Sequence, residues 1–183
     1  MARIPYVDAP LPGTDDPEGL RPLYEEMASA RGSVLDLYRA LANAPGALRA
    51  YFALSRYIRD GSSLDPQLRE LAIVATGYAL DVEYERFHHE PAARRAGVTD
   101  AQLAAVPAWR TAPDGVFDRL EQAVLTYVEE VARTRTAAPE TVAALQDLLS
   151  PAQLIDLVLT VAFYHLLAAV ILPLDIEPEQ TAG

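Results

Sequence analysis

Cysteine is absent from this sequence of 183 residues. Its absence excludes disulfide bonds, thiolate metal sites and every reaction in which a thiol acts as nucleophile or redox centre. Positive charge is also scarce, because 15 Lys and Arg residues face 26 Asp and Glu residues and give a formal net charge of −11. Without a basic stripe to neutralise phosphate groups, we expect neither nucleic acid nor an anionic membrane surface to be a partner.

The sequence also lacks a recognisable signal peptide and a long apolar span. Residues 1–15 contain several prolines and acidic residues, and we expect a loose leader and a cytoplasmic protein. The longest apolar run, residues 157–172, contains Thr160, Tyr164 and His165 and is shorter than the roughly 20 residues that a bilayer requires. We therefore expect a buried helix there, and no membrane as a partner.

The composition is that of one globular domain. Hydrophobic residues make up 51% of the chain and charged residues 22%, which is far from the profile of a disordered chain. A length of 183 residues lies within the usual size of a domain and is enough to bury a hydrophobic core. We therefore expect a single domain over residues 1–183, with C-terminal helices over residues 114–172.

Apolar residues recur at spacings of three and four rather than two, and Pro and Gly separate the segments that carry them. This periodicity predicts an all-α fold without strands. We expect a kink at Pro91, which interrupts helical hydrogen bonding, and the end of the last helix before Pro173. The predicted helix starts lie at Asp16 with Pro17, Ser33, Pro45, Asp65 with Pro66, Thr99, Asp114, Pro139, and Ser150 with Pro151.

A short internal echo suggests two related helical halves. It aligns four residues of one segment with four of another when one residue is inserted, and it rests on common residue types. It therefore suggests a duplicated helical hairpin rather than a repeat array. The aligned residues are Leu64, Pro66, Glu70 and Tyr78 in the first half and Leu149, Pro151, Asp156 and Tyr164 in the second.

Residues 70–89 contain the groups best suited to chemistry. Glu70 is flanked by apolar residues, where a carboxylate needs a hydrogen-bonding or charged partner. Glu85 is followed by His88 at a spacing of three and by His89 at a spacing of four, so an acid and an imidazole can share one helix face. A hairpin of these two helices would bring two carboxylates and an imidazole together, and such a group can transfer protons.

Glu85 and His88 also have the Glu-x-x-His spacing of carboxylate-bridged iron sites in helical bundles. Such sites need this motif twice, together with further glutamates, and we find it once. We therefore expect no metal. His165, alone on an apolar helix, is expected to be a core histidine, and Tyr127 and Tyr164 are expected only to pack in the core.

The segment LDPQLRELAIVATGYALDVEYERFHHEPAARRAGV, residues 64–98, resembles the carboxymuconolactone decarboxylase and alkylhydroperoxidase D (AhpD) superfamily. Members of that superfamily share an early glutamate, a short motif that ends in histidine about a dozen residues later, and an alanine-rich stretch followed by glycine. These features fall on Glu70, residues 82–89 and Gly97. The resemblance covers residues 40–106, the core motif region, and extends weakly over the last helix.

The resemblance is to the decarboxylase-like branch of this superfamily. In the peroxidase branch, two cysteines three residues apart stand at the positions of Val82 and Glu85, and both thiols are absent here. The acidic and aromatic triplet at residues 83–85, followed by His89, resembles the decarboxylase-like branch instead. That branch usually has tryptophan where this chain has Arg86, and the departure leaves the identity of the substrate open.

The resemblance implies an all-helical bundle of the AhpD-like type, assembled as a homotrimer or homohexamer with active sites at or near subunit contacts. The apolar last helix favours an oligomer independently, because it has more apolar surface than a small monomer readily hides. The resemblance also implies a lyase or isomerase without a cofactor. Its substrate would be a small unsaturated carboxylated lactone or a related cyclic acid.

In this interpretation, an imidazole donates a proton, one carboxylate orients it and another assists the transfer. The catalytic candidates are His89, Glu70 and Glu85. The candidates for substrate binding are Arg86, Tyr84 and His88, of which the arginine suits an anionic group. Two alternatives stay open: a hydroperoxide reductase-like protein that lacks thiol chemistry, and a noncatalytic oligomeric scaffold or ligand-binding protein.

Overall fold

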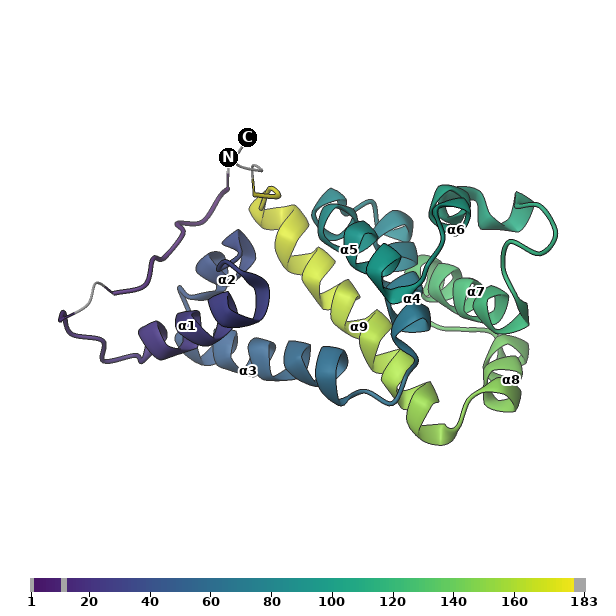
Figure 1. Cartoon of the computed structure of the whole chain (residues 1–183), viewed down its shortest axis with the longest axis horizontal. Coiled ribbons are helices and arrows are strands. Elements are labelled where there is room, and N and C mark those ends of the chain that lie inside the picture. Colours follow the sequence, from purple (N-terminus) through teal and green to yellow (C-terminus); the bar gives the residue numbers. More distant parts are fainter. Residues whose placement is uncertain (1, 11–12, 180–183) are drawn as a thin grey trace. The chain divides into compact units, whose positions relative to one another are not determined.

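The computed structural model describes residues 2–10 and 13–179, and helices account for most of them (Figure 1). No strand occurs in this described part of the chain, so the all-α prediction is confirmed. The α-helices are α1 (Leu20–Arg31), α2 (Asp36–Leu41), α3 (Pro45–Arg56), α4 (Pro66–Ala79), α5 (Glu83–Ala96), α6 (Asp100–Ala105), α7 (Arg119–Thr134), α8 (Pro139–Leu148) and α9 (Pro151–Leu174). A π-helical turn, Tyr57–Gly61, follows α3, and a 3₁₀ segment, Val106–Thr111, follows α6.

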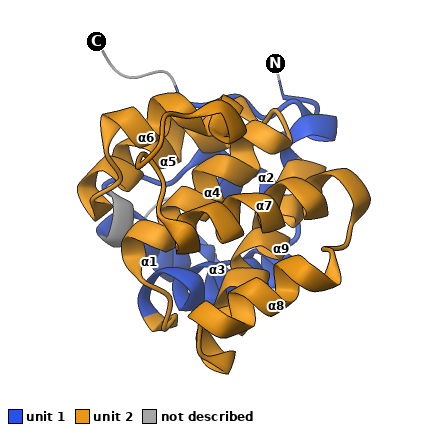
Figure 2. Ribbon diagram, turned by 90° about the vertical axis from the view of Figure 1, so that its right-hand side faces the viewer, with its two compact units in different colours: residues 1–60, 171–183 blue, residues 61–170 orange. Residues whose placement is uncertain are grey.

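The contacts within the chain define two compact units (Figure 2). The first unit contains the residues up to 60 and those from 171 onward, and the second contains residues 61–170. The expectation of a single domain over residues 1–183 stays a prediction. All the candidate site residues lie in the second unit, together with the apolar core that supports them.

In the first unit, α1 begins at Leu20 and not at Pro17 as predicted. The reason is Gly19, which adopts a left-handed conformation with a φ of 60° and keeps the preceding residues out of the helix. The Asp16 carboxylate nevertheless accepts hydrogen bonds from the backbone N–H groups of Leu20 and Arg21, both at 2.9 Å. The N-cap is therefore Gly19 and not Asp16 as predicted, although the Asp16 carboxylate still satisfies the first two N–H groups of the helix.

α2 begins at Asp36 rather than beside Ser33, so the predicted start is wrong. Leu35 precedes the helix in an extended conformation and has no polar side chain to cap it, and the Asp36 N–H instead donates to Glu179 Oε1 at 2.6 Å. The predicted leader contains no helix or strand within its described residues. Backbone hydrogen bonds hold it within the first unit, and one of them joins the Val7 N–H to the Arg39 carbonyl at 3.0 Å.

α4 begins as the sequence predicts, with Asp65 as N-cap and Pro66 in the first turn. The Asp65 carboxylate accepts hydrogen bonds from the N–H groups of Gln67 at 2.9 Å and Leu68 at 3.2 Å. These bonds satisfy two of the donors that the start of a helix leaves unpaired. Most of α4 is buried, and the helix packs against α5, α7 and the 3₁₀ segment.

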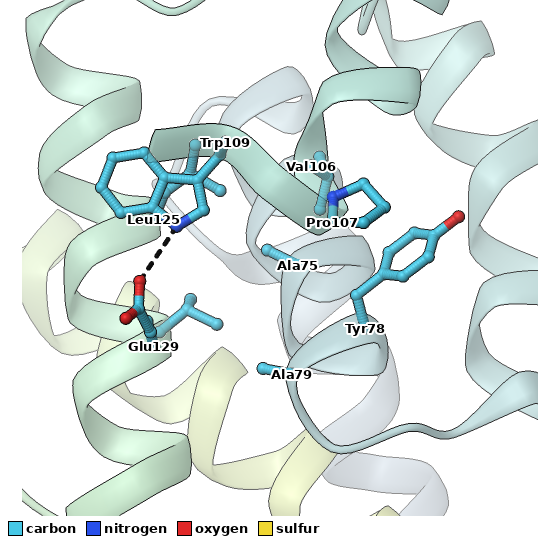
Figure 3. Close-up of a pocket in the computed structure, with 9 residues that line it drawn as sticks. Ala75, Tyr78, Ala79, Val106, Pro107, Trp109, Leu125 and Glu129 are labelled. Carbon is cyan, nitrogen blue, oxygen red and sulfur yellow. Dashed lines mark hydrogen bonds between the residues drawn. The ribbon is translucent and has the colours of Figure 1, made fainter. Parts of the chain in front are cut away.

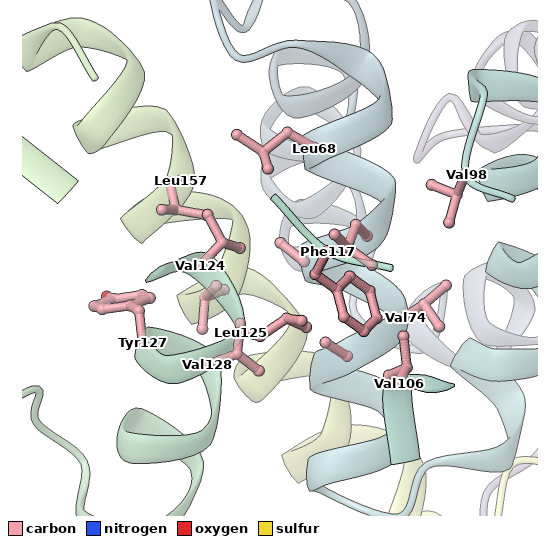
Figure 4. Packing of buried hydrophobic residues seen from close by; sticks show 14 of the residues in the cluster. Leu68, Val74, Val98, Val106, Phe117, Val124, Leu125, Tyr127, Val128 and Leu157 are labelled. Carbon is pink, nitrogen blue, oxygen red and sulfur yellow. The ribbon is translucent and has the colours of Figure 1, made fainter. Parts of the chain in front are cut away.

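The core of the second unit is a continuous apolar cluster, shown in Figure 4. Leu71 and Val74 from α4 and Val124 and Leu125 from α7 are almost completely buried within it. Burial of one such side chain stabilises a fold by about 1.5–3 kcal/mol. The cluster therefore fixes α4 firmly, and α4 in turn provides the surface on which α5 packs.

Two prolines at predicted interruptions lie inside helices. α5 continues through Pro91, and α9 continues through Pro173. The predicted end before Pro173 is wrong, because a proline removes one backbone donor and packing of the remaining helix can offset that loss. The kink expected at Pro91 stays a prediction. Gly97 ends α5, with a φ of 108° that glycine adopts without strain.

The start of α7 also differs from its prediction. Asp118, and not Asp114, accepts a hydrogen bond from the Glu121 N–H at 2.8 Å. The Glu121 side chain accepts one in return from the Asp118 N–H at 2.8 Å, which completes a capping box. The same reciprocal arrangement joins Thr99 and Gln102 at the start of α6, where the sequence predicts it.

α9 is long and apolar enough to span a membrane by length and composition, and it alone passes that test in the part of the chain that the structure describes. Its most apolar window has a mean hydropathy of 2.3 and is 44% buried. The polar residues of α9 favour a core helix, because the Asp156 carboxylate accepts hydrogen bonds from the N–H and hydroxyl of Ser63 at 2.6 and 2.7 Å. The helix is longer than the predicted run of residues 157–172.

Gly77 allows α5 to approach α4 closely. A Cβ atom at this position would lie 3.4 Å from side-chain carbons of both Glu85 and Arg86, which is an ordinary contact distance. We therefore expect Gly77→Ala to keep or raise the free energy of unfolding, by up to about 1 kcal/mol, through its higher helix propensity. Gly77→Leu should lower it by about 1–3 kcal/mol through overpacking. Urea unfolding followed by circular dichroism measures both changes, and equal losses in the two variants would contradict the close approach.

Candidate functional site

The candidate site lies on the hairpin formed by α4 and α5. The two helices pack against each other, and a hydrogen bond of 2.8 Å from the Val82 N–H to the Gly77 carbonyl closes the turn between them. Glu70 on α4 and Glu85 on α5 are both buried. Because a buried carboxylate is unfavourable without partners, the groups around these two side chains define what the site can do.

His89 is held at both of its ring nitrogens. Nδ1 lies 2.8 Å from Glu70 Oε2, and Nε2 lies 2.9 Å from the hydroxyl of Tyr164 on α9. The His89 and Tyr164 rings meet edge to face, with centroids 5.0 Å apart. The exposed fractions are 5% for Glu70, 8% for His89 and 5% for Tyr164. The acid and the imidazole therefore meet as the sequence predicts, whereas their catalytic roles stay predictions.

The neutral and the protonated imidazole can each satisfy both hydrogen bonds, because a phenol hydroxyl can donate or accept. In the neutral tautomer with its proton on Nδ1, the His89 ring donates to the Glu70 carboxylate, and its Nε2 lone pair accepts the proton of the Tyr164 hydroxyl. Glu85 Oε2 lies 3.6 Å from the same Nε2. When the ring is protonated, the Glu85 carboxylate therefore lies near the Nε2–H group.

The surroundings of Glu70 favour its ionised form. Burial raises the pKa of this carboxyl group, but the hydrogen bond and charge of His89, together with Arg69, outweigh burial, so the pKa of Glu70 lies below its usual value. Arg69 Nη2 is 3.4 Å from Glu70 Oε1. Glu70 is therefore a carboxylate at neutral pH and can orient the imidazole through Nδ1.

Tyr164 is a member of the site for which the sequence predicted only packing. The internal echo contained the relevant signal, because it aligns Tyr164 with Tyr78. In the structure, the Tyr78 hydroxyl donates to Glu90 Oε1 at 2.8 Å, and the Tyr164 hydroxyl contacts the neighbouring His89. The two halves of the echo thus each direct a tyrosine hydroxyl to α5, at adjacent residues.

The three predicted substrate-binding side chains have other partners. Arg86 Nη1 lies 3.0 Å from Asp81 Oδ1, and the guanidinium carbon lies 5.1 Å from the centroid of the Tyr78 ring. The Tyr84 and His88 rings contact each other, with centroids 4.6 Å apart. None of these contacts includes the buried acid or its imidazole, and a role in substrate binding stays a prediction.

The site offers acid–base groups. A carboxylate, an imidazole and a phenol stand in one hydrogen-bonded row, and such a row can hold or move a proton. The row contains no thiol, because the chain has no cysteine. Within residues 2–10 and 13–179, no group of three or more His, Cys, Asp and Glu side chains is arranged to hold a metal ion.

One family model matches part of the chain. Residues 45–130 match the sequence model of the Carboxymuconolactone decarboxylase family. This range includes α4 and α5, and with them Glu70, Glu85 and His89, but it ends before Tyr164. The superfamily resemblance that the sequence suggests is thereby confirmed. No curated protein sequence matches the chain.

Solved structures share the fold. An uncharacterized peroxidase-related protein from Silicibacter sp. TM1040 is 19% identical, with a TM-score of 0.77 and coverage of 92% of this chain and 90% of that one. An AhpD-core protein from Ralstonia eutropha JMP134 is 20% identical, with a TM-score of 0.76 and coverage of 90% and 87%. A cysteine-to-alanine variant of the debrominase Bmp8, in complex with 2,3,4-tribromopyrrole, is 19% identical, with a TM-score of 0.75 and coverage of 96% and 94%. These similarities confirm the AhpD-like fold.

Glu70 gives the pH dependence of stability a definite sign. Its pKa is lowered in the folded chain, so ionised Glu70 stabilises the fold above the unfolded-state pKa of about 4.3, and this contribution is lost as the pH falls through the folded-state pKa. We expect Glu70→Gln to lower the free energy of unfolding by about 2 kcal/mol near pH 7. The difference between the two proteins should shrink on acidification to about pH 3.

Chemical denaturation at the two pH values measures this difference. The matched control is Glu83→Gln, an exposed position on the same helix as His89. It should change the free energy of unfolding by less than about 0.5 kcal/mol at either pH. A deficit for Glu70→Gln that stays constant or grows on acidification would contradict the lowered pKa of Glu70.

Proposed function

Because residues 45–130 carry the carboxymuconolactone decarboxylase family pattern on an AhpD-like fold, we propose that this protein is a lyase or isomerase that works by proton transfer. Its proposed substrate is a small unsaturated carboxylated lactone or a related cyclic acid, and no cofactor takes part. The observation that carries the proposal is the row of Glu70, His89 and Tyr164, joined by hydrogen bonds of 2.8 and 2.9 Å.

In the proposed reaction, the substrate accepts the electrons of the breaking bond. When the bond to the carboxylate breaks, its electron pair moves into a conjugated carbonyl of the substrate, and carbon dioxide leaves behind a dienolate. Protonated His89 donates the Nε2 proton to the dienolate carbon, and Glu70 stabilises the imidazolium through Nδ1. Glu85 then returns a proton from solvent to the ring. Without loss of carbon dioxide, the same groups would move a double bond.

Tyr164 is a positioning residue in this proposal. Its hydroxyl holds Nε2 in the absence of substrate, so a substrate must displace the phenol to reach the imidazole. Arg86, Tyr84 and His88 are retained as proposed substrate-binding side chains. Of these, the arginine must leave Asp81 before its guanidinium can pair with a substrate carboxylate.

A homotrimer or homohexamer in the cytoplasm is part of the same proposal. α9 exposes large apolar side chains, with exposed fractions of 63% for Ile155 and 50% for Leu166. A subunit contact over α9 would remove this apolar surface from water. Assembly of this kind would place subunit contacts on the helix that also carries Tyr164.

A second candidate is a noncatalytic ligand-binding or scaffold protein. It is favoured by the burial of the whole row and by the occupation of both imidazole nitrogens by groups of the protein itself. Hydroperoxide reduction is disfavoured, because the chain has no cysteine that could form a sulfenate or disulfide. Replacement of the imidazole distinguishes the lyase or isomerase from the noncatalytic protein, because only the enzyme would lose turnover.

Substitutions of two residues of the row, His89 and Tyr164, test the proposed function. His89→Ala should lower release of carbon dioxide from muconolactone-type acids by at least about 100-fold, because the proton donor is lost. Tyr164→Phe should lower it by about 10-fold through mispositioning of the ring, and a shifted pH profile should accompany the loss. Size-exclusion chromatography should show the parent oligomeric state in both variants.

The matched control is Tyr127→Phe, at a buried tyrosine of the core cluster outside the row. It should leave turnover unchanged. Full activity of His89→Ala would remove the central role of the imidazole. Failure of the parent protein to turn over any acid of the panel, together with saturable binding of one, would favour the ligand-binding function.

A further inference from the structure

A separate pocket lies between the C-terminal half of α4, the 3₁₀ segment and α7 (Figure 3). Its volume is about 190 Å³, and none of the three residues of the acid–imidazole–phenol row lines it. Most of its wall is apolar. The apolar lining consists of Ala75, Ala79, Val106, Pro107, Leu125 and Val128.

The space exists because two small side chains stand one turn apart on α4. Ala75 and Ala79 lie at a spacing of four, so their methyl groups face the same side of the helix. Leucines or valines at these positions would fill the volume that the alanines leave open. An apolar cavity of about 150 Å³ is large enough for benzene, so this pocket has the size for one aromatic ring with a small substituent.

Two aromatic side chains form further parts of the wall, and each is held in place. The Tyr78 hydroxyl donates to Glu90 Oε1 at 2.8 Å, and the Trp109 indole N–H donates to Glu129 Oε2 at 3.2 Å. Figure 3 shows the two aromatic rings on opposite sides of the pocket. A wall that is ordered before binding loses little conformational entropy when a ligand arrives.

An arginine that does not line the pocket lies over one face of each aromatic ring. The guanidinium carbon of Arg86 lies 5.1 Å from the Tyr78 centroid, and that of Arg110 lies 4.4 Å from the Trp109 centroid. A cation on one face draws on the electrons of the ring, so the other face attracts a second cation less strongly. The two rings therefore favour a neutral partner over an organic ammonium ion.

Glu129 supplies the polar group of the pocket. Its carboxylate accepts from Arg110 Nε at 2.8 Å and lies 3.9 Å from Arg133 Nη1, so much of its charge is compensated. A carboxylate is an acceptor only, and a hydrogen bond to it is stronger than one between neutral groups. A ligand that carries one O–H or N–H donor would gain from this group, whereas an anion has no proton to donate and would have to bury its charge against a mostly apolar wall.

We propose that this pocket is a second small-molecule site, which binds a neutral single-ring aromatic compound with one hydrogen-bond donor. Phenol is the simplest compound of this class. Its ring lies between Tyr78 and Trp109 against the two alanines, and its hydroxyl donates to Glu129. This site is independent of the proton-transfer row and of the reaction proposed for it.

Trp109 provides the test, because it is the one tryptophan in the sequence. Phenol, benzene and benzoate are titrated into the full-length protein, and tryptophan emission is excited at wavelengths that phenol does not absorb. We expect a saturable change with phenol, with a dissociation constant of about 1 mM or lower. Benzene, which lacks the donor, should bind about tenfold more weakly, and benzoate should give no saturable change.

Two variants fill the pocket, and a third is the matched control. Ala75→Leu and Ala79→Leu should each weaken phenol binding by at least about tenfold, because the side chain takes the place of the ring. Ala104→Leu, an exposed alanine of α6 that does not line the pocket, should bind phenol as the parent does. If Ala75→Leu does not fold, Ala79→Leu decides, because Ala79 is exposed at the pocket mouth.

The opposite results would overturn the proposal. They are the absence of a saturable change with phenol, equal affinities for phenol in the Ala79→Leu and Ala104→Leu variants, or binding of benzoate as tight as that of phenol. The reaction at His89 need not be known for any of these measurements. Loss of activity in His89→Ala with intact phenol binding would separate the two sites.

Discussion

The second unit depends on the need to satisfy a carboxylate and an imidazole inside an apolar core. Glu70 lies on a helix that is buried over most of its surface, and an unpaired charge there would be strongly destabilising. His89 removes that cost through Nδ1, and Tyr164 satisfies the remaining nitrogen. Because the three side chains come from α4, α5 and α9, this single row fixes the relative positions of three helices within the unit. Apolar packing alone would permit several registers, whereas a buried hydrogen-bonded row permits few.

The two halves of the sequence echo have the same residue types at matching positions, but these residues bind different partners. α4 and α9 both begin with proline, and each carries an acid in its second turn and a tyrosine eight residues after that acid. The acid of α4 binds the imidazole, whereas Asp156 of α9 binds the backbone and hydroxyl of Ser63. The tyrosines contact adjacent residues of α5. One half thus provides the carboxylate that binds the imidazole, while the other provides the carboxylate that binds Ser63 and the phenol that binds the imidazole.

Parts of this arrangement follow from local sequence, and other parts do not. The Glu70 and His89 contact was predictable, because a carboxylate in an apolar helix requires a partner and the next helix offers one. Tyr164 was not predicted, because it lies 75 residues from His89 along an apolar helix, where a tyrosine ordinarily packs. The charge of Arg86 predicts a role in substrate binding, which stays a prediction; the spacing does not predict that its guanidinium lies 3.0 Å from Asp81 Oδ1 at the turn. Which of several possible partners a side chain binds depends on the folded geometry, and residue spacing in the sequence does not predict it.

Helix starts show the same distinction between local and tertiary control. An aspartate followed by proline predicts the start of α4 correctly, because nothing between Asp65 and Leu68 opposes the helical conformation. The same pair at Asp16 predicts the start of α1 three residues early, because Gly19 takes a left-handed conformation that the pattern does not encode. A cap signal therefore predicts which carboxylate satisfies the first N–H groups more reliably than it predicts where the helix begins.

Glu85 shows what the absence of cysteine means for the chemistry. In the superfamily that the sequence resembles, the peroxidase branch has a thiol at the position of Glu85; here the Glu85 Oε2 lies 3.6 Å from His89 Nε2. A thiol at that distance could be activated by the imidazole and would form a bond to its substrate. A carboxylate cannot do this redox chemistry, but it can exchange a proton with an imidazole or stabilise its charged form. With Val82 and Glu85 at the two cysteine positions, this hairpin offers a carboxylate and an imidazole suited to acid–base chemistry and no thiol for redox chemistry.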